Sequence, residues 1–149
     1  MNLFQELDRE LSGLEQMQAL IRAGGRAPIG ETLEFQLVEV GDGLAVFEGT
    51  PGPHAYNPVG SVHGGYAATL LDSACGCAVH TKLSAEQAYT TLELKVAYHK
   101  ALTAKTGTVR AEGRVLTIGR RVAFSEAKLV DSAGVLYASA TSTLLVFAR

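Results

Sequence analysis

The stretch that decides the fold is GGYAATLLDSACGCAVH, residues 64–80. Nearly every side chain in it is apolar or small, which is typical of a helix buried in a protein interior. Asp72 is the only charged residue between His63 and Lys82, and an unpaired buried carboxylate costs several kcal/mol. The fold must therefore either pair this carboxylate or use it, and both interpretations are open at this point.

The bulk composition is that of one ordinary globular domain spanning residues 1–149, with 47% apolar and 19% charged residues. The net charge of −2 gives no electrostatic footprint for nucleic acid or for an anionic membrane, so neither is expected as a partner. We expect Cys75 and Cys77 to be free thiols that pack as small buried hydrophobic residues, which is typical of a reducing compartment. The first ten residues lack the basic and apolar regions of a signal peptide, and we expect a cytoplasmic protein.

Hydrophobic periodicity divides the chain into helices and strands. Apolar residues recur at threes and fours up to Gly24-Gly25, which predicts an amphipathic N-terminal helix over about residues 3–23. Alternating patterns predict a hairpin before the buried helix and four strands after it. The expected strands are Thr32–Val40, Leu44–Glu48, Tyr89–Tyr98, Val109–Val115, Val122–Val130 and Val135–Phe147. This order favours an α+β domain with one helix against a strongly curved antiparallel sheet.

The polar and small residues of the buried helix fall on one stripe at helical spacing. They are Thr69, Asp72, Ser73, Gly76 and His80. The stripe predicts that Asp72 faces a boundary, a cleft or a subunit interface. A structural aspartate bonded to a neighbouring residue remains the alternative.

The start of the same helix carries a second signal. His63-Gly64-Gly65 lies where a loop becomes the helix, and helix N-termini present free backbone N–H groups at the positive end of the dipole. Glycines leave that backbone accessible to a ligand, so the Gly64 N–H is suited to stabilising an oxyanion. A tight turn is the simpler explanation of the glycine pair.

The spacing of these two groups constrains the assembly. Gly64 and Asp72 are eight residues apart, which is about 12 Å along a helix axis. One carbonyl group cannot touch both in a single chain. If both act on one substrate, two antiparallel copies of the helix must lie side by side, and the protein must be at least a dimer.

The chain resembles hotdog-fold acyl-CoA thioesterases in the spacing Asn57-(five residues)-His63-Gly64-Gly65-(six residues)-Asp72. The later segment TTLELKVAY, residues 90–98, extends the resemblance. The nearest branch is the phenylacetic-acid-degradation (PaaI-like) group. The resemblance covers about residues 30–147, which we take as the core of a hotdog domain, whereas the N-terminal helix varies among these proteins.

The resemblance implies a role for each matching residue. Asp72 is implied as the catalytic carboxylate, acting as a general base on water or as a nucleophile on the thioester carbonyl. The Gly64 N–H of the other subunit is implied to polarise that carbonyl. The other implied site residues are Asn57 and His63 beside the thioester, Thr91 near the attacking water, Gly65 at the ligand, and two segments along coenzyme A, Tyr98-His99-Lys100 and Gly119-Arg120-Arg121.

Several of these residues also have a structural interpretation. Asn57 precedes Pro58 and could simply be a turn residue. His63 could be an ordinary loop residue, and Thr91 an ordinary strand residue. The coenzyme segment departs from the relatives, since many of them read aromatic-x-Arg-Pro where this chain has Tyr98-His99-Lys100-Ala101.

The sequence therefore predicts an acyl-CoA thioesterase that is at least a homodimer and forms a tetramer from two dimers. No metal or redox cofactor is expected, and coenzyme A enters as part of the substrate. The alternatives are an acyl-CoA-binding protein without turnover and a hotdog dehydratase or hydratase. Aryl and medium-chain acyl groups would both suit a pocket lined by Tyr66 and Leu70, and the sequence does not choose between them.

Overall fold

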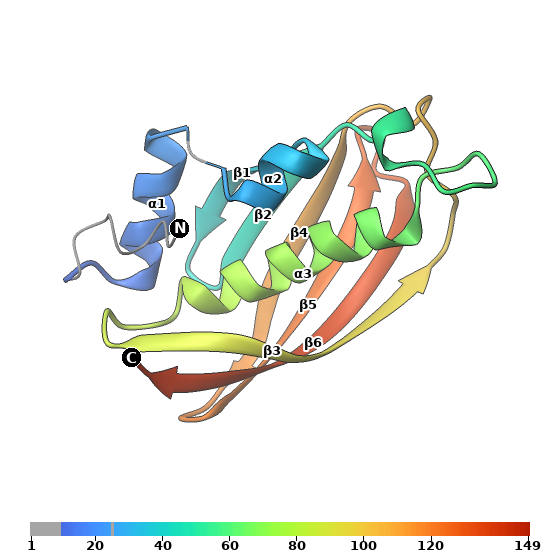
Figure 1. Cartoon of the computed structure of the whole chain (residues 1–149). Coiled ribbons are helices and arrows are strands. Elements are labelled where there is room, and N and C mark those ends of the chain that lie inside the picture. Colours follow the sequence, from blue (N-terminus) through green and yellow to red (C-terminus); the bar gives the residue numbers. More distant parts are fainter. Residues whose placement is uncertain (1–9, 25) are drawn as a thin grey trace.

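The computed structural model describes residues 10–24 and 26–149. They form one six-stranded antiparallel sheet that curves around a long helix (Figure 1). The helix, α3 (Gly64–His80), has the bounds that the sequence predicts and contacts all six strands. This is the hotdog architecture, so the predicted fold class is confirmed.

The strands follow the order β1-β2-β4-β5-β6-β3 across the sheet. Their number agrees with the sequence analysis, and their ends differ from it by a few residues. The strands are β1 (Phe35–Gly41), β2 (Leu44–Gly49), β3 (Gln87–Tyr98), β4 (Val109–Ile118), β5 (Val122–Asp131) and β6 (Leu136–Ala148). The two edges of the sheet are therefore β1 and β3, and β3 is one of its longest strands.

The segment before β1 was predicted wrongly, because residues 32–33 belong to a short helix and not to a strand. This helix, α2 (Pro28–Leu33), begins with a proline, which suits the first turn because no N–H partner is needed there. Glu34 ends it in the left-handed region with φ 58°, and its N–H donates to the Gly30 carbonyl. A short 3-10 helix, η2 (Pro53–Ala55), lies in the loop between β2 and α3.

The N-terminal helix α1 (Gly13–Arg22) packs beside the C-terminal end of α3. The predicted helix over residues 3–23 is confirmed for residues 13–22, whereas residues 3–9 lie outside the described part. Two hydrogen bonds fix α1: the Gly13 N–H donates to the Leu83 carbonyl at 2.9 Å, and His80 Nε2 donates to Gln16 Oε1 at 2.9 Å. Both side chains of the second pair are buried.

The core lies between α3 and the concave face of the sheet. Small residues dominate the inward positions of the central strands, including Ala111, Ala127, Ala138 and Ala140. At Gly113 of β4, a methyl group would collide with the backbone carbonyl of Ala74 in α3. The helix therefore lies closer to the sheet than any larger side chain there would allow. In the described part of the chain, no helix combines the length and apolar character required to cross a bilayer.

We expect Gly113→Ala to lower the free energy of unfolding by about 1–3 kcal/mol, because overpacking forces α3 away from β4. Gly41→Ala is the matched control, since a methyl group there would meet only Leu44 side-chain atoms at 3.7 Å. Urea denaturation of both variants measures the difference. Equal stability of the two variants would contradict the proposed contact.

The stability should also fall at acidic pH because of His80. Burial lowers the pKa of His80 from 6.5 to about 4 in the folded state. The unfolded chain therefore takes up this proton first, and stability is lost as the pH falls from about 6.5 towards 4, at up to about 1.4 kcal/mol per pH unit. Above pH 6.5 the group has no such effect.

The measurement is urea denaturation at pH 7.5 and pH 5 for the wild type, His80→Gln and His99→Gln. We expect the acid loss to shrink in His80→Gln, whose amide can still bond to Gln16. The exposed His99 is the control, and its replacement should leave the loss unchanged. An identical acid loss in all three proteins would argue against the buried histidine as its source.

Candidate active site

One stripe of α3 faces away from the sheet and is half-exposed. It contains Gly65, Thr69, Asp72, Ser73 and Cys77. The predicted polar stripe is thus confirmed around Asp72. It was wrong in including Gly76 and His80, which are both buried.

Asp72 is held by one neighbouring strand residue. Thr91 Oγ1 in β3 donates a hydrogen bond to Asp72 Oδ1 at 3.0 Å. In the described part of the chain, no ion pair involves this carboxylate. The structure therefore brings two of the predicted site residues together and leaves the negative charge of Asp72 uncompensated by a cation.

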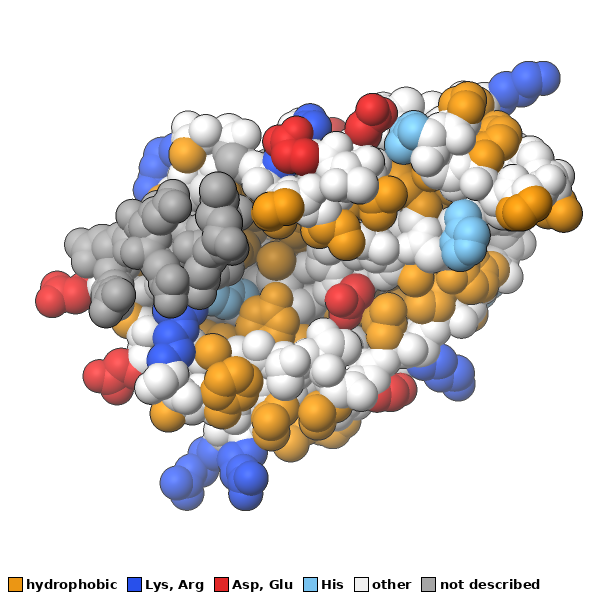
Figure 2. All heavy atoms as spheres, viewed as in Figure 1, with side chains coloured by type: hydrophobic (Ala, Val, Ile, Leu, Met, Phe, Trp, Pro, Cys, Tyr) orange, Lys and Arg blue, Asp and Glu red, His pale blue; other side chains and the backbone are white. Residues whose placement is uncertain are grey.

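Asp72 opens into a large cavity, with a volume of about 800 Å³. This Asp72 cavity lies between α3 and the α1–α2 segment, where Figure 2 shows a hollow lined by hydrophobic side chains. Its walls come from six elements and the residues that lead into α2. The lining residues are Met17, Leu20, Arg26, Ala27, Pro28, Ile29, Gly30, Phe35, Gln36, Leu37, Phe47, Asp72, Ser73, Cys77, Tyr89, Thr90 and Thr91.

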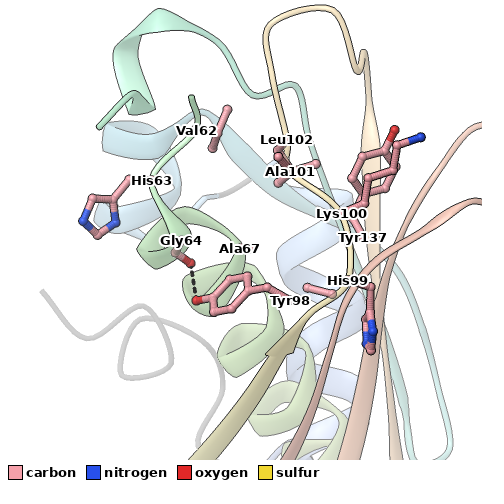
Figure 3. A pocket seen from close by; sticks show the side chains of 11 residues that line it. Val62, His63, Gly64, Ala67, Tyr98, His99, Lys100, Ala101, Leu102 and Tyr137 are labelled. Atoms are coloured by element: carbon pink, nitrogen blue, oxygen red, sulfur yellow. Dashed lines mark hydrogen bonds between the residues drawn. The ribbon is translucent and has the colours of Figure 1, made fainter. Parts of the chain in front are cut away.

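A second cavity, of about 290 Å³, lies at the other end of α3 and is shown in Figure 3. We call it the Gly64 cavity. Besides Gly64 and His63 it is lined by Tyr98, His99 and Lys100, which follow one another at the end of β3. The sequence predicted these residues as one coenzyme segment, and the structure places them in one cavity. Asp72 does not line it, so a single chain holds Gly64 and Asp72 in separate cavities.

The Gly64 backbone is partly bonded and partly free. Tyr98 Oη donates a hydrogen bond to the Gly64 carbonyl at 2.7 Å (Figure 3). The Gly64 N–H, at the first position of α3, has no acceptor among the described residues. It is therefore available to a ligand, and the helix dipole favours a negative charge there.

His63 is the N-cap of α3, and its hydrogen bond fixes which ring nitrogen carries the proton. His63 Nδ1 accepts from the Gly65 N–H at 2.8 Å, so the neutral ring carries its proton on Nε2. The side chain is exposed and points away from the other labelled residues in Figure 3. Its outer nitrogen is thus a hydrogen-bond donor.

The side chain of Asn57 makes its hydrogen bonds within its own loop. Its side-chain oxygen accepts from the N–H groups of Val59 and Ser61 at 3.1 and 3.2 Å, and its amide donates to Ser61 Oγ at 3.0 Å. These bonds hold the loop that leads into α3. The structure therefore gives Asn57 a positioning role within its own chain.

The segment Gly119-Arg120-Arg121 is far from the other predicted coenzyme segment. It is the exposed turn between β4 and β5. The next residue, Val122, pairs with Leu145, which pairs with Thr90 of β3. Thr90 lies eight residues before Tyr98, about 26 Å along an extended strand. Within one chain the two coenzyme segments therefore do not form one groove.

Other nucleophiles near Asp72 are poorly suited to neutral pH. Burial raises the pKa of the Cys75 thiol to about 11 and that of the Cys77 thiol to about 12. Both groups therefore stay protonated at neutral pH, and the thiolate is the reactive form. Across residues 10–24 and 26–149, no three His, Cys, Asp or Glu side chains gather closely enough to hold a metal ion.

The expected pocket of Tyr66 and Leu70 was wrong. Both side chains are buried in the core and line none of the cavities described. Residues that do line the Asp72 cavity were missed, above all Met17 and Leu20 of α1 and Ile29 of α2. Met17 belongs to the apolar stripe of the N-terminal helix, but the sequence could not show what that stripe packs against, and Leu20 and Ile29 gave no signal.

Known proteins share this architecture. The model of the thioesterase superfamily matches residues 59–138. A conserved protein from Pseudomonas aeruginosa is 30% identical over 85% of this chain and 98% of its own, with a TM-score of 0.76. A phenylacetic acid degradation-related protein from Ralstonia eutropha is 26% identical over 87% of this chain and 98% of its own, also with a TM-score of 0.76.

More distant similarity concerns the fold alone. The PaaI protein of the E. coli phenylacetic acid degradation operon is 18% identical over 91% of this chain and 94% of its own, with a TM-score of 0.78. No curated protein sequence matches the chain.

We expect His63→Ala to lower the free energy of unfolding by about 1 kcal/mol, because it removes the cap of α3. His63→Asn should recover most of that loss, since asparagine is a good N-cap and can accept from the Gly65 N–H. Denaturant titration of the two variants measures the difference. If both are as stable as the wild type, the cap does not contribute to folding.

Proposed function

Since the chain belongs to the thioesterase superfamily, we propose that it hydrolyses acyl-CoA thioesters to a free acid and coenzyme A. The observation that carries the proposal is the Asp72 carboxylate, which no cation neutralises in the described part of the chain and which opens into the larger of the two cavities along α3. A carboxylate on an otherwise apolar helix is costly to keep unless it is paired or used. Asp72 has one hydroxyl donor and a face open to a ligand.

The second part of the proposal is a composite site made by two chains. The free Gly64 N–H and the Asp72 carboxylate lie in different cavities of one chain, about 12 Å apart along α3. A two-fold related copy with its helix antiparallel brings the Gly64 N–H of one subunit to the Asp72 of the other. The free edge strand β3 supports such a pairing, because long edges with unpaired N–H and C=O groups are covered in stable proteins.

Two hydrogen bonds between β3 and α3 suggest the register of that pairing. Thr91 bonds to Asp72, and Tyr98 bonds to Gly64. Because β3 has a bulge between Thr91 and Glu93, antiparallel pairing of two β3 strands centred on Lys95 sets Thr91 opposite the partner's Tyr98. One pairing thus brings the carboxylate of one subunit towards the amide of the other, twice in each dimer.

The chemistry follows from the two groups. The partner's Gly64 N–H polarises the thioester carbonyl and stabilises the oxyanion that forms on it. Asp72 takes a proton from the attacking water, the tetrahedral intermediate then breaks its C–S bond, and the protonated Asp72 returns the proton to the departing coenzyme A sulfur. In the alternative route Asp72 itself attacks the carbonyl, which expels the coenzyme A thiolate and leaves a mixed anhydride, and water then hydrolyses this anhydride to the free acid and Asp72. In both routes Thr91 orients the carboxylate, and the Nε2–H of His63 is a further donor.

We expect Asp72→Asn to lower kcat by about 10²–10⁴-fold on an acyl-CoA substrate, because the amide can neither accept the proton nor attack. Binding of the same acyl-CoA, measured by calorimetry, should survive. Asp42→Asn, at an exposed carboxylate bonded to Lys82, is the control and should keep full activity. Undiminished turnover in Asp72→Asn would remove Asp72 from the mechanism.

The composite site has its own test. Gly64→Pro removes the proposed N–H donor at a helix position that proline favours, after a residue whose ψ of 134° suits a following proline. Gly64→Ala is the matched control, since it adds the same Cβ against Tyr98 and keeps the N–H. We expect kcat to fall about 10²–10³-fold more in the proline variant.

Mixing subunits then assigns the two groups to different chains. In a dimer of one Asp72→Asn subunit and one Gly64→Pro subunit, both defects fall in one site and the other site is intact. Refolding the inactive variants together should restore about a quarter of the wild-type activity, as expected for random pairing in a symmetric dimer. No recovery would mean that each chain supplies both groups to its own site.

A further inference from the structure

We infer that the N-terminal segment α1–α2 is the specificity element of the site, and that it selects large apolar acyl groups over acetyl. This inference rests on the proposed function, because it assigns the Asp72 cavity to the acyl half of the thioester. The assignment follows from the chemistry of the walls and from the position of α1.

The lining of the Asp72 cavity suits an acyl group and not the coenzyme. Away from Asp72 the walls are mostly apolar and include the aromatic pair Phe35 and Phe47, whose ring centroids are 5.9 Å apart. Among the described residues, Arg26 is the only cation that lines the cavity, and its guanidinium already bonds to Gln36 at 2.8 and 3.2 Å. A nucleotide with several phosphates would find few partners there, whereas an apolar chain would be desolvated.

The Gly64 cavity is also mostly apolar, but it adds a lysine, two histidines and the N-terminus of α3. Lys100 and His99 line it beside backbone groups of the α3 N-terminus, and these are the groups that phosphates and other anions prefer. In the composite site the two cavities meet at the scissile bond from different subunits. The coenzyme half therefore belongs on the Gly64 side and the acyl half on the Asp72 side.

The position of α1 makes it a fixed wall of the acyl cavity. Met17 is only 1% exposed, although it also lines the cavity. The helix is held by the capping box of Ser12 and Glu15 and by the buried bond between Gln16 and His80. A wall fixed in this way limits how far an acyl chain can extend from Asp72.

The volume of the Asp72 cavity indicates a preference for long acyl chains over short ones. A cavity of about 800 Å³ lies in the upper part of the range of small-molecule sites, and an acetyl group would leave most of it unfilled. Each added CH₂ buried in the cavity should raise kcat/KM roughly fourfold, which corresponds to about 0.8 kcal/mol per CH₂, until the chain meets α1 or α2.

The test is a series of acetyl-, butanoyl-, hexanoyl- and octanoyl-CoA assayed on the full-length protein and on Leu20→Trp and Ile29→Trp. Both positions line the cavity, and Ile29 is 50% exposed, so its replacement should leave folding intact. We expect kcat/KM for octanoyl-CoA to fall at least about tenfold in both variants, which a loss of two buried CH₂ contacts would cause, while that for butanoyl-CoA stays within about twofold. Gln18→Trp, on the exposed side of α1, is the control and should keep the wild-type series.

The outcomes separate this inference from the proposed function. Turnover that is indifferent to chain length, or equal losses on all substrates in the tryptophan variants, would overturn the inference and leave the hydrolase proposal standing. The same series of non-hydrolysable acyl-CoA thioethers, measured by calorimetry, covers the reverse case. Chain-length-dependent affinity that Leu20→Trp and Ile29→Trp abolish, without turnover of any thioester, would support the inference and refute the proposed function.

Discussion

The close approach of α3 to the sheet is the constraint on which the rest of the structure depends. At Gly113 the sheet has no room for even a methyl group beneath the backbone of Ala74, and the neighbouring inward positions are mostly alanines. Tight contact along one side of the helix fixes its rotation about its own axis. The stripe that carries Asp72 must then face away from the sheet, and the apolar side must face it. The site therefore owes its orientation to packing in the core, not to the polar residues themselves.

The same packing explains how much of the fold could be predicted from the sequence. Residues 64–80 are apolar almost throughout, and the hydrophobic effect buries such a helix in the core. In β5 burial alternates cleanly, because one face meets α3 and the other meets water, whereas a bulge between Thr91 and Glu93 interrupts the alternation of β3. At Thr32 and Leu33 the alternation was misleading: it is compatible with a strand, but Pro28 and the left-handed Glu34 make the segment a single helical turn before β1. Short elements whose ends are set by backbone conformation leave little periodicity to detect.

The site was predictable only where its members are close in sequence or share a strand. Asp72 stood out because a charge in an apolar helix is costly, and its bond to Thr91 is a cross-element contact that strand alternation alone could not give. Met17 and Leu20 reach the same cavity from α1, and that depends on how Gln16 and His80 dock the two helices. A pattern of apolar residues states that a face will be buried, but not against which partner. The segment Gly119-Arg120-Arg121 matches the relatives locally, but a local match does not give its distance from the other predicted coenzyme segment. In the fold it lies about 26 Å along the sheet from Tyr98.

The proposed site is divided between the core elements α3 and β3 and the N-terminal segment α1–α2, and this division affects how substitutions change the substrate range. The proposed chemical groups, Asp72, Thr91 and Gly64, lie on α3 and β3, which the core holds rigidly and which a dimer would share. The far wall of the Asp72 cavity comes instead from α1 and α2, which contact the core through few elements. Substitutions in that wall can alter the shape offered to an acyl group without moving the carboxylate or the amide. A separate segment docked on a tightly packed core thus lets one fold keep its chemistry while its substrate range changes. The buried pair Gln16 and His80 is the link through which such changes would also reach stability, because it joins α1 to the end of the helix that carries the site.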